Sequence, residues 1–188
     1  ILVAGAQGHV LIDSGTVAGA QVVLDNIGKL GFRPNEIASL LHSHEHFDHV
    51  GGHAAIKRAS GAHVVASPRA AAVLRSSQDD PGDPQYGMHD PMEPVAVDVV
   101  VHGGETIRSE TAALTAIATP GHTPGSICLL LGTALFSGDT LFPGGPGASR
   151  SNAALQEEIA SITARLYPLP EGTLVLPGHG PGTTIGES

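Results

Sequence analysis

The sequence contains no tryptophan, only one cysteine, and few charged or aromatic side chains. A single cysteine excludes an internal disulfide and a cysteine-based zinc cage. Its 18 acidic and 9 basic residues give a formal net charge of −9. That balance argues against a nucleic-acid partner, because such partners need a basic surface. No apolar run reaches the ~18 residues of a membrane span, so we expect a soluble protein without a membrane partner.

Glycine, proline and histidine are abundant instead, with 25, 14 and 11 residues respectively. The glycines and prolines indicate many tight turns. At ~150 residues per domain, 188 residues correspond to about one domain. No linker or short repeat divides the chain, so we predict a single domain over residues 1–188. Localisation stays open between the cytoplasm and, with a leader removed before Ile1, the periplasm or exterior.

Helical and strand patterns occur in both halves of the chain, which predicts layers of helix over sheet. The predicted helices are Val17–Leu30, Ala54–Ala59, Pro68–Arg75 and the amphipathic Ala153–Leu166. The predicted strands are Ile1–Ala4, His9–Ile12, Ile37–Leu41, His63–Ala66, Val97–Val101, Glu105–Ile107, Ala112–Ala118, Ile127–Leu131, Ala134–Phe136 and Thr173–Leu176. Ser76–Pro94 and the Gly/Pro-rich Leu141–Ser151 are predicted loops, and long loops in compact domains are usually functional or disordered.

Histidines and aspartates gather where predicted strands run out into Gly/Pro-rich loops, which is typical of functional residues. The densest group is the H-x-H-x-D-H pattern of His44–His49, directly after the strand Ile37–Leu41. Single residues follow three later strands, in the motifs P-G-H, G-D-T and P-G-H-G: His122, Asp139 and His179. A layered sheet would bring these strand ends to one edge.

Imidazole and carboxylate are ligands of zinc and related divalent ions. His44 and His46 fit one ion, with His122 as the third nitrogen and a fourth position open for water. Asp48, His49 and His179 fit a second ion, and Asp139 fits a bridging position. Two ions ~3.5–4 Å apart hold a hydroxide at neutral pH and stabilise both the attacking and leaving groups. Without a thiolate, the set also suits iron or manganese.

Other histidines have simpler interpretations. His9, His63 and His102 are predicted to be structural or solvated, and His53 is expected at the surface. His42, at the end of its strand, either packs in the core or supports a ligand. Cys128, inside an apolar run, is predicted to be a buried small hydrophobe.

The chain resembles the metallo-β-lactamase superfamily through HSHEHFDHVGG, ATPGHTPGS, LFSGDTLF and LVLPGHGPGTTIG, in that order. The resemblance implies an α+β fold, the four-layer αββα sandwich, with a two-zinc site. It implies the same two ligand sets as above, and Asp48 as the catalytic residue that orients the hydroxide attacking a carbonyl. Asp13, in LIDSG, matches an aspartate that supports the ligands from behind.

Two parts of the chain resemble different subgroups. Residues from Ile1 to about Ile127 look like the third subclass of metallo-β-lactamases, whereas the remainder looks like glyoxalase II and related hydrolases. Asp139 is unusual for that subclass of β-lactamase, and the glutathione-binding helical domain of glyoxalase II is not among these residues.

We expect a small-molecule substrate, with a β-lactam-type cyclic amide first and a thioester, ester or lactone as the alternative. The predicted substrate contacts are Tyr86, Met88, His89 and Arg150. Redox or phosphodiester chemistry with iron or manganese, and a binding protein with a vestigial site, are the competing classes. The oligomeric state is left open.

Overall fold

The computed structural model describes residues 1–188 except 7, 79, 84, 86 and 109–111. The chain divides into two compact units. The N-terminal unit comprises Ile1–Val101 and Arg108–Ala112, and the C-terminal unit comprises His102–Ile107 and Ala113–Ser188. The prediction of a single domain over residues 1–188 stays a prediction.

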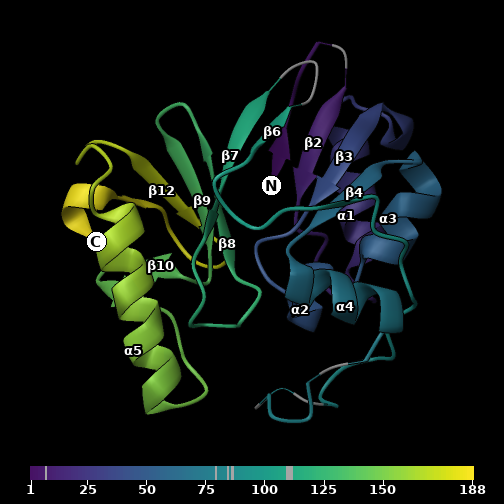
Figure 1. Ribbon diagram of the computed structural model, residues 1–188. Coiled ribbons are helices and arrows are strands. Elements are labelled where there is room, and N and C mark those ends of the chain that lie inside the picture. Colours follow the sequence, from purple (N-terminus) through teal and green to yellow (C-terminus); the bar gives the residue numbers. More distant parts are fainter. Residues whose placement is uncertain (7, 79, 84, 86, 109–111) are drawn as a thin grey trace. The chain divides into compact units, whose positions relative to one another are not determined.

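The N-terminal unit is built on a sheet with strand order β1-β2-β3-β4-β5 (Figure 1). β1 pairs antiparallel with β2, and the pairs from β2 to β5 are parallel. The strands are β1 (Leu2–Val3), β2 (His9–Ile12), β3 (Ile37–Leu41), β4 (His63–Ala66) and β5 (Val99–Val100). The helices of this unit are α1 (Ala20–Lys29), α2 (Phe47–Val50), α3 (His53–Ser60) and α4 (Pro68–Ser76), with a 3-10 turn at Pro34–Glu36.

This unit has an apolar core between its parallel strands and its helices. Leu40 on β3, Val64 on β4 and Ile56 on α3 have no exposed surface. Strands that are buried on both faces read as apolar runs, as β2 does with four buried residues in succession. The predicted helix Val17–Leu30 begins later, at Ala20, because the hydroxyl and carbonyl of Thr16 accept the Gly19 N–H in a preceding turn.

The C-terminal unit is built on a mixed sheet with strand order β13-β12-β9-β8-β7-β6. β9 and β12 run parallel, while β7–β8, β8–β9 and β12–β13 are antiparallel. The strands are β6 (Thr106–Arg108), β7 (Ala113–Ala118), β8 (Ile127–Leu131), β9 (Ala134–Gly138), β12 (Leu174–Pro177) and β13 (Thr183–Thr184). A core around Cys128, Leu135 and Leu166 fills this unit.

Two predictions are corrected here. Leu141–Ser151 is not only loop, because β10 (Leu141–Phe142) pairs antiparallel with β11 (Gly145–Pro146). The predicted amphipathic helix Ala153–Leu166 is α5 (Asn152–Ser161), continued by a π-helical turn at Ile162–Leu166, and a last 3-10 turn covers Ile185–Glu187. The buried positions of α5 are polar, Glu158 and Ser161. The prediction of an α+β protein with helices and sheets in both halves is confirmed.

Candidate metal centre

The ends of two parallel strands bring the first group of predicted residues together. Ile12 at the end of β2 pairs with Leu41 at the end of β3. The residues that follow, Asp13 and Ser43, therefore meet at the same edge of the sheet. We call His44, His46, Asp48 and His49 the first ligand cluster; they lie on the segment that follows β3 and turns into α2.

Asp13 fixes this segment through contacts with Ser43 and His49. Its carboxylate accepts the backbone N–H of Ser43 at 2.7 Å and the Ser43 hydroxyl at 2.9 Å, and Oδ2 lies 3.0 Å from His49 Nδ1. Burial alone raises the pKa of Asp13, but the hydrogen bond and charge of His49 and the two bonds from Ser43 outweigh it and lower the pKa to about 2. An ionised Asp13 fixes the proton of His49 on Nδ1 and leaves Nε2 for an ion.

His44 and His46 face each other, with His44 Nε2 3.1 Å from His46 Nδ1. Two nitrogens bound at ~2.0–2.1 Å to one tetrahedral zinc lie roughly 3.3 Å apart, so this spacing fits two ligands of one ion. His46 Nε2 is 2.8 Å from Oδ2 of Asp83, a residue of the long loop. Asp83 therefore fastens that loop to a candidate ligand.

Asp48 completes the first ligand cluster. Its Oδ2 lies 3.6 Å from His49 Nε2, and a quarter of its side chain is exposed. A carboxylate in this position is accessible to solvent beside a histidine whose other nitrogen is already engaged by Asp13. It is thus placed both to bind an ion and to contact a water molecule.

The second ligand cluster consists of His122, Asp139 and His179 in the C-terminal unit. Gly138 at the end of β9 and Pro177 at the end of β12 are paired in parallel, and the Gly178 N–H donates to the Gly138 carbonyl at 2.8 Å. Asp139 and His179 therefore lie together, with 3.7 Å between Asp139 Oδ2 and His179 Nε2. The same carboxylate oxygen lies 4.0 Å from His122 Nε2.

His122 is oriented by a backbone group. Its Nδ1 lies 2.6 Å from the carbonyl oxygen of Ala148. A carbonyl only accepts, so the proton is on Nδ1, and Nε2 keeps its lone pair on the side of Asp139. This is the arrangement in which histidine binds a metal through Nε2.

The donors of both clusters are imidazole nitrogens and carboxylate oxygens, which suit zinc, iron and manganese. The one cysteine, Cys128, is confirmed as a buried side chain, and burial raises the pKa of its thiol to about 11. Metal ligation by the individual residues of the two clusters stays a prediction at this point.

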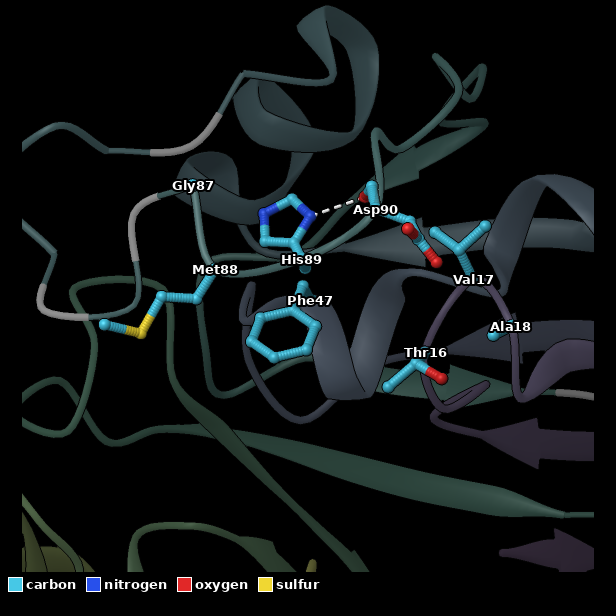
Figure 2. Close-up of a pocket in the computed structure, with 8 residues that line it drawn as sticks. All are labelled: Thr16, Val17, Ala18, Phe47, Gly87, Met88, His89 and Asp90. Atoms are coloured by element: carbon cyan, nitrogen blue, oxygen red, sulfur yellow. Dashed lines mark hydrogen bonds between the residues drawn. The ribbon is translucent and has the colours of Figure 1, made fainter.

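The predicted substrate contacts lie in different places. Met88 and His89 line a pocket of ≈ 520 Å³ in the N-terminal unit (Figure 2), whose other lining residues include Phe47 and Asp90. The rings of Phe47 and His89 stack with centroids 4.7 Å apart. Arg150 is exposed in the loop before α5. Tyr86 is outside the described residues.

One prediction about the remaining histidines is wrong. His53 is not at the surface; it is fully buried at the start of α3, with Nδ1 2.7 Å from the Ser14 hydroxyl. The close packing of Gly52 against Ser14 draws the first turn of α3 into the core. His42 is also buried, and its Nε2 accepts the backbone N–H of Ser67 at 2.9 Å.

Sequence reasoning missed Ser43 and Asp83, which hold the first ligand cluster, and the burial of Glu158 in α5. Ser43 and Asp83 had a signal, since one adjoins the histidine motif and the other lies in an acidic loop. Glu158 had none, because an acidic residue in a surface helix is normally solvated.

The helices in the described part of the chain include none with the length and hydrophobicity of a membrane span.

Comparisons with known proteins agree with this fold. The sequence family described as "Metallo-beta-lactamase superfamily" matches residues 1–184. A hydroxyacylglutathione hydrolase from Polaromonas sp. is 36% identical over 148 residues, which are 77% of this chain and 49% of that protein. The chain spans about half the length of the curated relatives it matches first.

The similar solved structures are metallo-β-lactamases, whereas the first similar sequences are hydroxyacylglutathione hydrolases. The chain is similar to MEM-A1, a subclass B3 metallo-β-lactamase from a soil metagenome library, with 35% identity and a TM-score of 0.78 over 95% of this chain and 72% of that one. A metallo-β-lactamase from Cronobacter sakazakii has 33% identity and a TM-score of 0.79, over 95% and 70%. The predicted fold class is confirmed, and the chain belongs to the metallo-β-lactamase superfamily.

Proposed function

We propose that this chain is a metal-dependent hydrolase that cleaves the carbonyl–nitrogen bond of a β-lactam-type cyclic amide. The observation that carries the proposal is the orientation of the histidine rings. His49 and His122 each engage a protein acceptor through Nδ1, which leaves both Nε2 atoms for an ion.

The proposed ligands come from both clusters. His44, His46 and His122 would hold one zinc ion, Asp48, His49 and His179 a second, and Asp139 would bridge them. Iron or manganese would also be compatible with these donors. When bound, such ions supply an acidified water molecule and polarise the scissile carbonyl.

The residues of the chain have separate roles in this proposal. The carboxylate of Asp48, which is partly exposed beside His49, orients the attacking water and takes up its proton. Asp13 keeps the His49 ring in place and its proton on Nδ1.

Two of the substrate contacts that we propose, Met88 and His89, line the pocket of Figure 2. Phe47 follows His46 directly in the chain, so the segment that carries the first ligand cluster also contributes a residue to this pocket. The stacked rings of Phe47 and His89, together with Met88, offer an apolar face to a compact, rigid ring system. We also propose a substrate contact for Tyr86, which lies outside the described residues, and a contact of Arg150 with a carboxylate of the substrate.

Hydrolysis of a thioester, ester or lactone is the second candidate. It is favoured by Asp139, whose carboxylate lies within 4.0 Å of two histidine nitrogens, and by relatives named hydroxyacylglutathione hydrolases. The β-lactam proposal takes precedence because this chain covers 72% of a similar β-lactamase structure, against 49% and 58% of the first two of these relatives.

A substrate panel separates the two candidates. The protein, supplied with zinc, is assayed with nitrocefin, a carbapenem, S-lactoylglutathione and an acyl lactone. We expect lactam turnover that a chelator abolishes and zinc restores, and that His46→Asn removes while His63→Asn, at an exposed position, leaves it intact. Thioester turnover without lactam turnover would overturn the first choice, and stoichiometric iron by elemental analysis would favour redox or phosphodiester chemistry.

A further inference from the structure

Helix α5 buries a carboxylate beside the second ligand cluster. Glu158 has no exposed surface, although glutamate is almost never fully buried unless it is paired. Burying such a group is unfavourable unless its oxygens accept hydrogen bonds. Its partners therefore show what the buried carboxylate holds in place.

Those partners lie on the loop between β11 and α5. Glu158 Oε1 accepts the backbone N–H of Gly147 at 3.2 Å, and Oε2 accepts a short hydrogen bond from the Ser149 hydroxyl. The residue between these two donors is Ala148, whose carbonyl accepts the proton of His122 Nδ1. One carboxylate thus accepts hydrogen bonds from the residues on both sides of Ala148, whose carbonyl orients His122.

The same helix also holds the segment that carries His122. The Ser161 hydroxyl donates to the Pro120 carbonyl at 2.8 Å. Gly121 approaches so closely that a Cβ there would overlap Cα and Cβ of Glu158, and its φ of +148° suits glycine. Both ends of the Ala148–His122 hydrogen bond are therefore fixed to α5.

We propose that Glu158 is a positioning residue that fixes the tautomer and ring direction of His122 through the Ala148 carbonyl. The proposal rests on the proposed function, in which His122 binds an ion through Nε2. If the loop moves, the Ala148 carbonyl leaves Nδ1, the proton redistributes between the two nitrogens, and Nε2 is no longer reserved as a ligand. Groups that orient metal-binding histidines in this way typically contribute about 10- to 100-fold to metal affinity.

The test uses four single variants. Ser149→Ala removes the short bond from the loop without touching the helix, and Ser149→Thr keeps the hydroxyl. Glu158→Gln replaces one acceptor oxygen with an amide NH₂, so the Ser149 hydroxyl can keep its contact only by accepting instead of donating, and the bond loses the charge of the carboxylate. Glu157→Gln, on the exposed face of the same helix, is the matched control.

The first measurement is made on metal-free protein. Nitrogen–proton correlation spectra of the histidine rings, with the His122 signals assigned from His122→Gln, report the tautomer directly. We expect a single Nδ1–H form of His122 in the wild type, Ser149→Thr and Glu157→Gln. We expect a mixture of tautomers in Ser149→Ala and Glu158→Gln.

The second measurement is zinc affinity by competition with a chelator. Ser149→Ala and Glu158→Gln should bind zinc about 10- to 100-fold more weakly, while Ser149→Thr and Glu157→Gln stay within twofold of the wild type. Ser149→Ala decides the matter if Glu158→Gln fails to fold. An unchanged tautomer and unchanged affinity in folded Ser149→Ala would overturn the inference.

Failure of the proposed function has a different signature. A wild-type protein that hydrolyses none of the panel substrates would overturn the hydrolase proposal. The tautomer measurement needs neither substrate nor metal, so it judges the role of Glu158 independently.

Discussion

The two ligand clusters are supported in different ways. The first has four candidate ligands within six consecutive residues, and side chains hold it: Asp13 accepts the backbone N–H of Ser43, just before the cluster, and contacts the His49 ring. The second draws three candidate ligands from three separate loops, and a backbone carbonyl and a helix hold it. The first ligand cluster thus depends on a few side chains, whereas the second depends on the packing of helix α5.

The pKa shifts of the buried titratable groups also have opposite signs in the two units. In the N-terminal unit, burial first and then the charge of His42 lower the pKa of His53 to about 3. In the C-terminal unit, burial raises the pKa of Glu158 to about 7, the bonds from Ser149 and Gly147 act against it, and the charge of Asp139 adds to it. The two units should therefore lose stability in opposite directions of pH.

The largest effect is expected at His53. Below pH 6.5 the unfolded chain binds a proton that folded His53 rejects, so the free energy of unfolding falls as the pH falls toward 3. At about 1.4 kcal/mol per pKa unit, the loss is on the order of 5 kcal/mol over that window. Urea unfolding of metal-free His53→Leu should show a shallower acid dependence than the wild type, and exposed His63→Gln should show no such change. Equal slopes for wild type and His53→Leu would contradict this expectation.

The opposite trend is expected at Glu158. The folded state keeps a proton that the unfolded chain releases above pH 4.5, so the stabilisation is complete below 4.5 and lost as the pH rises through about 7. The change is on the order of 3 kcal/mol. In metal-free Glu158→Gln this part of the pH dependence should disappear, whereas Glu157→Gln should retain it. An unfolding free energy that depends on pH equally in Glu158→Gln and Glu157→Gln between pH 4.5 and 7 would count against it.

Asp13 offers a direct test of the side-chain support in the first cluster. Asp13→Asn retains the size of the residue and suits its left-handed φ of +61°, but it removes the charge that holds the His49 proton. We expect zinc affinity and turnover to fall about 10- to 100-fold. Asp25→Asn, at an exposed position on α1, is the control. If both variants bind zinc equally well, the first cluster does not depend on Asp13.

Much of the fold around the two ligand clusters could be predicted from the sequence, but part of what supports them could not. The strand ends at Ile12 and Leu41 were predicted correctly, and that at Pro177 to within one residue, because apolar runs stop there at polar or glycine-rich residues. The supporting role of Asp13 was implied by the family resemblance. The burial of His53 and Glu158 was not predictable, because both lie on helices, where exposure depends on which face meets the sheet and not on residue type. The hydrogen bond from His122 to Ala148 uses a backbone group, and backbone acceptors have no signature in a sequence.

The smallest effect is expected where a loop supports the first cluster from outside. His46 Nε2 meets Asp83 at 2.8 Å, but Asp83 belongs to a long loop and makes this one contact with the cluster, whereas Asp13 contacts both Ser43 and His49. A single hydrogen bond contributes about 0.5–1.5 kcal/mol net, which corresponds to a loss of roughly 2- to 13-fold in zinc affinity for Asp83→Asn. Glu93→Gln, on the same loop and exposed, controls for general loop effects. A loss as large as that of Asp13→Asn would mean that the long loop orients the first ligand cluster as strongly as the strand ends do, and the contrast between internal and external support would have to be abandoned.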